Sequence, residues 1–196
     1  MISENFVYLG AVISVAGGLS YVVATLKGKT KPNRVSWFLW FLAPMIAFAS
    51  QLQQGVHAQA LLTFTAGFNP LLVLIATFVS HKAQWKITRF DIICGSISVI
   101  AIIFWLLVKQ PNIAILFSIV ADGMAAVPTI VKSYKEPESE NANAFIGGII
   151  SAGLTLLTIN VWKFQNYAFS AYIFMICAIF VLLIKVRPAL VRRKTA

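Results

Sequence analysis

Long apolar runs separated by short polar turns divide the chain into seven segments. The runs lie at 5–26, 35–53, 58–80, 91–108, 112–132, 144–160 and 167–186. A helix needs roughly 20 residues to cross a hydrocarbon core about 30 Å thick, and each run comes close to that length. Strands of a membrane barrel are about ten residues long and alternate between apolar and polar positions, unlike these continuous runs. The pattern therefore predicts an all-α bundle of seven transmembrane helices.

Composition agrees with an integral membrane protein. The 196 residues are 59% hydrophobic and 11% charged, whereas soluble domains are about 45–50% apolar and about 25% charged. The first run follows Glu4 rather than a basic stretch and ends in a polar turn, so we expect it to stay in the mature protein instead of acting as a signal peptide. Cys94 and Cys177 fall inside predicted spans, where apolar packing is expected rather than a disulfide or a metal site.

The net charge of +10 raises the question of nucleic acid, but the placement of the charges argues for a membrane. Of the 16 Lys and Arg residues, Lys109 and Lys163 alone fall on one side of the predicted bundle, and the other fourteen fall on the opposite side. Cytoplasmic loops of membrane proteins carry an excess of Lys and Arg, so the N-terminus is expected outside and the C-terminus in the cytoplasm. The expected partner is the lipid bilayer and not nucleic acid, and the short loops favour a bacterial inner membrane. The other side collects Lys27, Lys29, Lys31, Arg34, Lys82, Lys86, Arg89, Lys132, Lys135, Lys185, Arg187, Arg192, Arg193 and Lys194.

Two polar turns on the basic side suggest an internal repeat. KGKTKPNR follows the first run and KSYKEPESENAN follows the fifth, and each turn is followed by one helix rising and one descending. The simplest division is a first three-helix repeat at 1–83, a linker helix at 84–110 and a second three-helix repeat at 111–196. The single linker allows two parallel triplets to share one orientation. Within the turns, Asn33, Asp91 and either Asn141 or Asn143 are predicted to cap the helices that follow.

The stretches AAVPTIVKSYKEPESENANAF at 125–145 and YVVATLKGKTKPNRVSWFLW at 21–40 resemble the PQ-loop superfamily, which includes SWEET sugar transporters, lysosomal amino-acid exporters and the KDEL receptor. Pro128 matches the family proline, and Lys132 and Lys135 match its basic turn. Thr129 stands where the family has glutamine, and Tyr21 or Ala24 stands where the first repeat has proline. The resemblance implies two parallel three-helix bundles joined by a linker helix, a 3+1+3 arrangement with the N-terminus away from the cytosol.

Asp122 lies near the middle of the fifth run. An aspartate at the centre of a spanning helix costs about 2.5–3.5 kcal/mol on insertion scales, so such residues face a bundle interior or a wet cavity. One interpretation is that Asp122 lines a translocation path, where it binds a cationic or hydroxylated substrate or takes up a proton. The other is a protonated side chain that bonds a neighbouring helix for packing alone. We favour the first, because acids inside membranes are functional by default.

Asn69 in the third run lies at much the same depth as Asp122, and Pro70 after it leaves a backbone carbonyl without its helical partner. The resemblance implies a pocket role, since an asparagine in helix three of SWEET-like proteins contributes to the substrate site. The alternative is an interhelical hydrogen bond worth about 0.6 kcal/mol. In the seventh run, Ser170 and Tyr172 are judged too near the outer end to complete a sugar pocket. The predicted substrate-binding residues are Asp122, Asn69, Phe68, Thr65 and Ser118.

Prolines and aromatic residues suggest further roles. Pro44, Pro70 and Pro128 are candidate hinges, while neighbouring glycines also permit close helix packing. Trp37 and Trp40 could stack on a sugar or base, but their place near the cytoplasmic headgroups favours anchoring. Aromatic belts are expected for Trp85, Trp162, Tyr134 and Tyr167. His57 and His81 lie in turns far apart, so no metal site is expected.

These features favour a small-solute transporter that works by alternating access, in which Asp122 could couple transport to protons. The solute class stays open between a sugar, an amino acid and a vitamin-like compound, as does the choice between a single chain and a homodimer. No catalytic constellation or cofactor motif is present in the sequence, so no enzyme is expected. The alternative is a ligand-binding or sorting receptor on the same fold, without transport.

Overall fold

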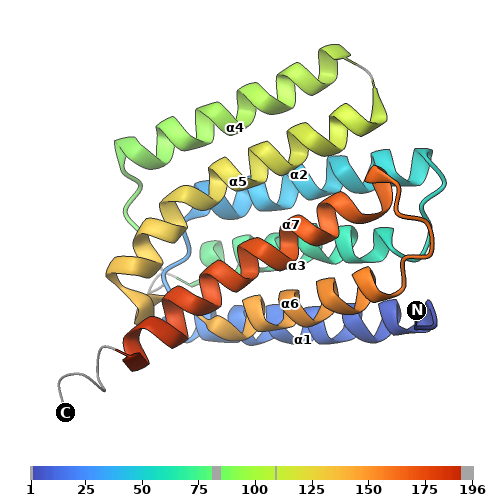
Figure 1. Cartoon of the computed structure of the whole chain (residues 1–196). Coiled ribbons are helices and arrows are strands. Elements are labelled where there is room, and N and C mark those ends of the chain that lie inside the picture. Colours follow the sequence, from blue (N-terminus) through green and yellow to red (C-terminus); the bar gives the residue numbers. More distant parts are fainter. Residues whose placement is uncertain (1, 81–84, 109, 191–196) are drawn as a thin grey trace.

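The computed structural model of the chain describes residues 2–80, 85–108 and 110–190, and within these ranges it is helical and has no strands (Figure 1). The seven apolar runs each match one α-helix, so the predicted all-α bundle is confirmed. The bounds are α1 Asn5–Leu26, α2 Arg34–Gln53, α3 Ala60–Val79, α4 Arg89–Val108, α5 Pro111–Lys135, α6 Ala142–Leu157 and α7 Phe164–Val181, with a 3-10 turn η1 at Pro137–Ser139 and a π-helical turn η2 at Leu182–Val186.

Local signals place the helix ends. The Asn33 side chain accepts hydrogen bonds from the first free amides of α2, and Asn141 accepts one of 2.9 Å from the Asn143 amide at the start of α6. Both predicted caps are confirmed. Pro111 opens α5, where its fixed φ angle fits and no amide is needed. Gly28 ends the turn after α1 with a φ of 68°, a conformation that favours glycine.

The prediction that Asp91 caps α4 is wrong. Thr88 caps this helix, because its hydroxyl accepts a hydrogen bond of 3.3 Å from the Asp91 amide. Asp91 lies inside the first turn of α4, where its Oδ2 accepts a hydrogen bond of 2.6 Å from the Thr88 amide. Its Oδ1 accepts a bond of 2.8 Å from the Asn33 side chain. One buried carboxylate therefore holds the start of α4 against the start of α2.

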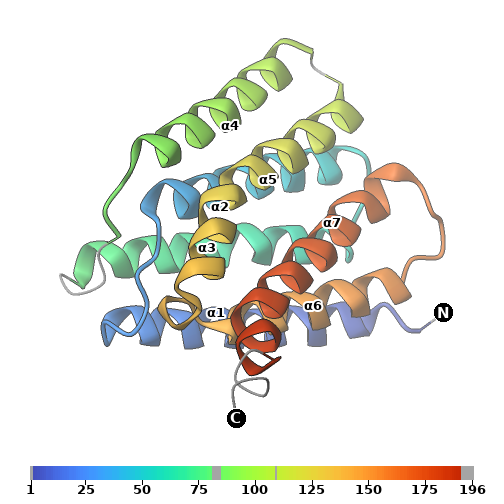
Figure 2. The same ribbon diagram turned by 60° about the vertical axis from the view of Figure 1, so that its left-hand side comes forward.

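Helices that follow one another in the chain run in opposite directions along one bundle, and the described chain begins and finishes at opposite ends of it (Figure 1). Helix α3 packs against both α1 and α2, and α7 packs against both α5 and α6. The two sets meet where α1 packs on α6 and where α2 packs on α5. Helix α4 lies at the edge and packs mainly on α5, as the turned view also shows (Figure 2).

The α1–α6 contact is close because glycines line it. A Cβ added at Gly17 would lie 2.7 Å from the Asn143 carbonyl oxygen, and one at Gly147 would lie 3.0 Å from the Ile13 carbonyl oxygen. Helices in membranes use small residues in this way to bring their backbones together. This contact sets the distance between the two halves on one side of the bundle.

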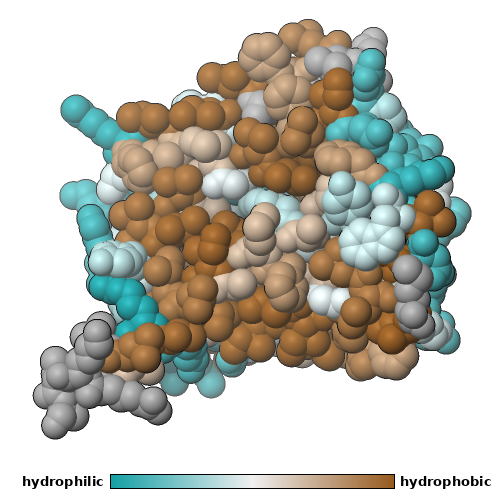
Figure 3. All heavy atoms as spheres, viewed as in Figure 1, coloured by the Kyte–Doolittle hydropathy of each residue, from teal (hydrophilic) through white to brown (hydrophobic). Residues whose placement is uncertain are grey.

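The surface is that of a multi-pass membrane protein. Helices α1, α2, α3 and α5 and the segment Phe164–Leu190 are long and apolar enough to cross a membrane, and α4 and the 16-residue α6 are apolar as well. A hydrophobic surface covers the middle of the bundle between two hydrophilic ends (Figure 3). Large apolar side chains of α4 point outward, among them Ile93, Ile100 and Leu107.

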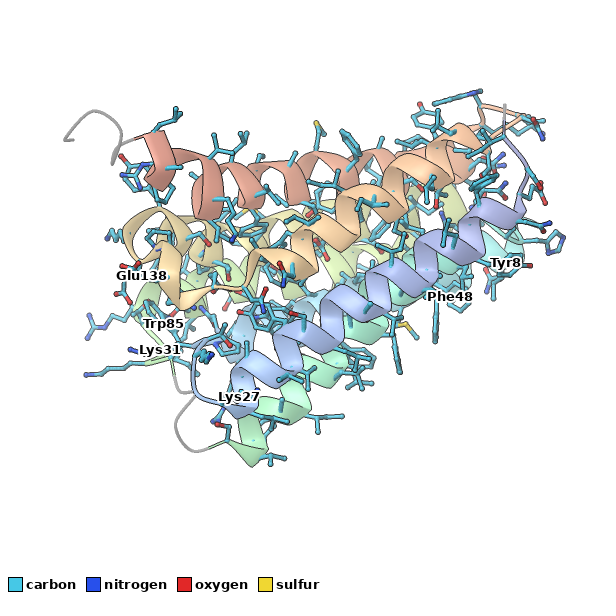
Figure 4. All side chains as sticks on the ribbon, turned by 90° about the horizontal axis from the view of Figure 1, so that it is seen from below. Tyr8, Lys27, Lys31, Phe48, Trp85 and Glu138 are labelled. Carbon is cyan, nitrogen blue, oxygen red and sulfur yellow. The ribbon has the colours of Figure 1, made fainter. Side chains whose placement is uncertain are left out.

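Basic residues gather where α1, α3, α5 and α7 finish, which we call the basic end. Lys27 and Lys31 lie there with Trp85 and Glu138, while Tyr8 lies toward the other end (Figure 4). Lys163 precedes α7 at the opposite end. The side chains of His81, Lys82, Lys109, Arg192, Arg193 and Lys194, for which sequence predictions were made, lie outside the described residues.

Candidate functional site

A cavity of about 90 Å³ lies between the helices at mid-bundle. Residues of α1, α2, α3, α5, α6 and α7 line it, so both sets of helices contribute to its wall. The volume is sufficient for several water-sized molecules. The wall is mainly apolar, and its hydrogen-bonding side chains outside the aromatic groups are Ser14, Asn69 and Asp122, with the Cys177 thiol beside them. A solute in this cavity would meet few polar groups and one carboxyl group.

Asp122 is 4% exposed and lies on the cavity wall. Its Oδ2 accepts a hydrogen bond of 2.6 Å from the Tyr172 hydroxyl, and its backbone oxygen accepts one of 3.2 Å from the Trp40 indole. Oδ1 accepts no hydrogen bond from the side chains or amides that the structure describes. One carboxylate oxygen is therefore left for a ligand or a proton.

Asn69 lies on the same wall but is bound to α1. Its Nδ2 donates to both the backbone oxygen and the hydroxyl of Ser14, each at 3.0 Å. Its Oδ1 has no partner among the described residues and presses against Gly18, where an added Cβ would lie 2.6 Å from it. Pro70 beside it also lines the cavity. Asn69 thus clamps α3 to α1 and shapes the wall.

Three other predicted site residues do not line the cavity. Thr65 is buried and donates its hydroxyl to the Leu62 carbonyl of its own helix at 2.9 Å. Phe68 stacks on Phe64 with ring centroids 5.6 Å apart. Ser118 is buried one turn before Asp122. The structure brings Asp122 and Asn69 together at the cavity and leaves Thr65, Phe68 and Ser118 out of its lining.

Five aromatic side chains form a continuous group on the basic side of the cavity, which we call the aromatic row. Ring centroids are 4.6, 5.3, 5.6 and 4.3 Å apart along its successive pairs. Helices α1, α6 and α7 each contribute one ring and α2 contributes two, so the aromatic row crosses from one set of helices to the other. In order, its members are Tyr21, Trp37, Trp40, Phe180 and Phe145.

The expected anchoring role of Trp37 and Trp40 is wrong. Their exposures are 3% and 7%, and both line the cavity. The Trp37 indole nitrogen is buried without a partner among the described residues. Their three-residue spacing on α2 places both rings on one face of that helix, and the face turns inward. Trp162 and Tyr134, by contrast, are exposed near the bundle ends, as expected for aromatic belts.

Tyr172 was placed too near the outer end by the sequence analysis, and its bond to Asp122 corrects this. Helix α7 begins at Phe164 rather than at 167, so Tyr172 lies more than two turns inside the helix. At a rise of 1.5 Å per residue, Tyr172 lies about 12 Å along the helix axis from Phe164. A long side chain at that depth reaches the Asp122 carboxylate.

A second buried polar group lies closer to the basic end, and we call it the Lys132–Glu140 cluster. Lys132 is 2% and Glu140 6% exposed, and Lys132 Nζ lies 2.5 Å from Glu140 Oε1. Glu140 Oε2 accepts a hydrogen bond from the Tyr21 hydroxyl, and Lys132 also donates to the Lys31 carbonyl oxygen. The ammonium group lies 4.9 Å above the Trp85 ring. The cluster joins the loop after α1 to the loop after α5.

The sequence analysis missed this cluster, because it treated 132–143 as a polar turn at the membrane surface. Instead, α5 continues to Lys135, and η1 folds the chain back so that Glu140 points inward. The Lys31 amide donates to the Ser139 carbonyl oxygen at 3.1 Å and holds the two loops together. Tyr21 touches both Trp37 and Glu140, so the aromatic row and the Lys132–Glu140 cluster are continuous.

The three candidate hinges and both cysteines lie inside helices. Pro44, Pro70 and Pro128 are inside α2, α3 and α5, and each helix continues through its proline. Cys94 and Cys177 are buried and free. No group of three or more potential metal ligands occurs in the described ranges.

The chain matches no protein-family model, no curated protein and no solved structure.

Proposed function

We propose that this protein is a small-solute carrier of the PQ-loop or SWEET-like type that works by alternating access around the central cavity. The observation that carries this function is the buried Asp122 carboxyl group on the cavity wall, one of its oxygens free of hydrogen bonds from the described residues. Packing alone gives no reason to leave a carboxylate oxygen unpaired beside an open volume at mid-membrane, whereas a passing solute would pair with it.

The helix contacts support a 3+1+3 arrangement, with repeats at 1–83 and 111–196 and a linker helix at 84–110. In the first repeat α3 packs against α1 and α2, and in the second α7 packs against α5 and α6. The contact of α1 with α6 corresponds to the contact of α5 with α2 when the repeats are exchanged. A carrier built from two parallel repeats has its solute site between them, where this cavity lies.

The basic end faces the cytoplasm and the N-terminus faces outside in this proposal, following the excess of Lys and Arg at that end. Lys132 does not count toward this excess, since it is buried in an ion pair rather than exposed to lipid headgroups. Lys27, Lys29, Lys31 and Lys135 support the same orientation without it. A bacterial inner membrane suits the short loops.

In this proposal the aromatic row and the Lys132–Glu140 cluster, which lie between the cavity and the basic end, form the barrier between the cavity and the cytoplasm. Tyr21 and Lys31 come from the first repeat, while Lys132 and Glu140 come from the second. Opening this side requires the repeats to part at these contacts. Pro128, one turn before Lys132, removes an amide from α5 where such a bend would occur.

A receptor on the same fold is the second candidate. A receptor that binds a peptide carboxylate needs buried cationic side chains. Within the described part of the bundle, the buried cation is Lys132, and Glu140 already neutralises it. The cavity carries an acid instead, which favours a carrier.

Purified protein in sealed vesicles tests this function. We expect labelled solute, selected by a thermal-shift screen of sugars, amino acids, vitamins and amines, to exchange across the vesicle wall. Asp122→Asn should abolish the exchange, and Ser118→Ala, a change one turn away at a residue outside the cavity lining, should preserve it. Solute that binds without crossing would favour the receptor, and equal exchange by Asp122→Asn and the unchanged protein would remove Asp122 from the function.

A further inference from the structure

The cavity has a negative group and no described positive side chain on its wall. Asp122 is its acid, and the lining includes no Lys, Arg or His. The described ion pair, Lys132 with Glu140, lies outside the lining. A carboxylate in an apolar interior is costly unless a cation or a proton neutralises it. Tyr172 supplies one hydrogen bond but no charge, so the site is incomplete for a negatively charged Asp122.

The aromatic rings near Asp122 add a second feature that suits a cation. Trp37, Trp40, Phe145 and Phe180 all line the cavity, and the Trp40 indole touches the backbone of Asp122 itself. Aromatic faces attract cations, most strongly tryptophan, and each contact is worth about 0.5–1 kcal/mol or more when water is excluded. A carboxylate beside several aromatic walls is the combination that recognises organic ammonium groups.

Other solute classes find less in this cavity. A sugar carries many hydroxyl groups that must all find partners when buried. The Asn69 amide nitrogen and the Ser14 hydroxyl are already bonded to each other. The Trp37 indole nitrogen and Asn69 Oδ1 are unpaired on the described wall, but they are fewer than the hydroxyl groups of a sugar. An organic anion would be repelled by Asp122. The carboxylate of an amino-acid zwitterion would find no cation on the described wall.

We therefore propose, on the basis of the carrier function above, that the solute is a small organic monocation, an amine or quaternary ammonium ion, which exchanges with a proton at Asp122. The organic cation and the proton each neutralise the Asp122 carboxylate with one positive charge. Binding of the cation releases the proton, and protonation of Asp122 releases the cation. One cation then moves one way for each proton that moves the other way, and the cycle carries no net charge.

The groups around Asp122 allow this exchange. From α7, the Tyr172 hydroxyl bonds it and the Cys177 thiol lies on the same cavity wall. From α2, the Trp40 indole donates to the Asp122 backbone oxygen, and Arg34 at the helix start is bonded to Thr77. From α4, the Ser98 hydroxyl bonds the Ala121 carbonyl oxygen at 2.8 Å, while Asp91 is paired with Asn33 at the basic end. The other charged groups on elements that pack against α5 lie at the ends of the bundle, and they are Arg89, Glu138 and Lys185.

Choline and 3,3-dimethylbutan-1-ol give a direct test, because the two molecules share a shape and differ in charge. Full-length protein in detergent should bind choline and should bind the neutral alcohol at least about tenfold more weakly, a difference of about 1.4 kcal/mol. Asp122→Asn should reduce choline binding by a similar factor or more, while Ser118→Ala should not. Trp40→Phe, which keeps an aromatic face, should weaken binding less than Trp40→Leu. Melting temperatures of the variants check that each one is folded.

Transport in sealed vesicles then tests the exchange. With an acidic vesicle interior, labelled choline should accumulate inside. The interior should lose one proton for each choline that enters, so its pH should rise. A membrane potential should not change the rate of uptake, because the exchange moves no net charge. Failure of choline to bind, or equal binding of choline and the neutral alcohol, would overturn the cation assignment. Uptake of glucose or alanine that depends on Asp122 would overturn it as well and would leave the carrier function intact. Choline that binds through Asp122 but does not cross would uphold the cation site and contradict both the exchange and the carrier.

Discussion

The Tyr172 hydroxyl on α7 donates a hydrogen bond of 2.6 Å to the Asp122 carboxylate on α5. The bond holds Oδ2 toward α7, and Oδ1 stays free of hydrogen bonds from the described residues. It also joins two helices whose direct packing is looser than that of α1 with α6. A single phenol therefore both orients the acid of the cavity and ties one wall of the cavity together.

Removal of this phenol should destabilise the protein. Tyr172→Phe keeps the ring and leaves Oδ2 of a buried acid without its donor, a loss of about 1–3 kcal/mol in the free energy of unfolding. Tyr167→Phe is the matched control, because Tyr167 lies on the same helix and its hydroxyl makes no hydrogen bond among the described residues. Unfolding followed by circular dichroism in detergent measures both variants. Equal stability of the two would mean that the bond contributes little.

The Lys132–Glu140 pair should be worth more to stability than an exposed ion pair. Glu140→Gln leaves the Lys132 ammonium buried without its counter-charge, which costs about 3–5 kcal/mol. Glu138→Gln in the same loop is the control, because Glu138 is exposed. The double variant Lys132→Met/Glu140→Gln should recover part of the loss, since no unpaired charge then stays buried. A double-mutant cycle from denaturation curves measures the coupling, and additive losses would show that the two side chains act independently.

The same pair should control access to the cavity from the basic end. Cys177 lines the cavity, and replacement of Cys94 with alanine leaves Cys177 as the single thiol. In that background, Glu140→Gln should increase the rate at which a small water-soluble thiol reagent modifies Cys177 from the basic end. Mass spectrometry of quenched samples gives the rate. The Glu138→Gln variant should react like the parent, and an unchanged rate in Glu140→Gln would exclude the pair as a barrier.

Close packing of α1 on α6 should make Gly17 intolerant of a side chain. In Gly17→Ala the new methyl group would lie 2.7 Å from the Asn143 carbonyl oxygen, so the two backbones must separate. Overpacking of this kind costs about 1–3 kcal/mol. Gly153→Ala is the control, because its methyl group would meet the Phe174 ring at an ordinary 3.6 Å. A melting temperature lowered in Gly153→Ala as much as in Gly17→Ala would contradict this view of the contact.

The sequence by itself determined the helices and several of their ends. In a hydrocarbon core the backbone must satisfy its hydrogen bonds within each segment, so a long apolar run is sufficient to predict a helix. Asn33 and Asn141 could be recognised as caps because capping depends on the next two or three residues alone. Asp122 and Asn69 could also be singled out, because a polar side chain at the middle of a membrane span is unusual wherever the helix lies in the bundle.

Tertiary structure decided which faces of the helices turn inward. A soluble helix reveals its buried face by the contrast between apolar and polar positions, but here lipid and protein interior are both apolar and the contrast is lost. Trp37 and Trp40 therefore looked like membrane anchors, although they line the cavity. Thr65, Phe68 and Ser118 looked like neighbours of Asp122, although they lie outside the lining of the cavity.

The folding of the loops decided which charged side chains are buried. Lys132 and Glu140 are eight residues apart in a stretch that reads as a polar turn, and their burial depends on η1, on Tyr21 and on the Lys31 carbonyl oxygen, all brought together by the packed helices. A charge is stable in an interior only when its partners surround it. The local sequence contains the charges, but only the assembled bundle supplies the partners that allow them to be buried.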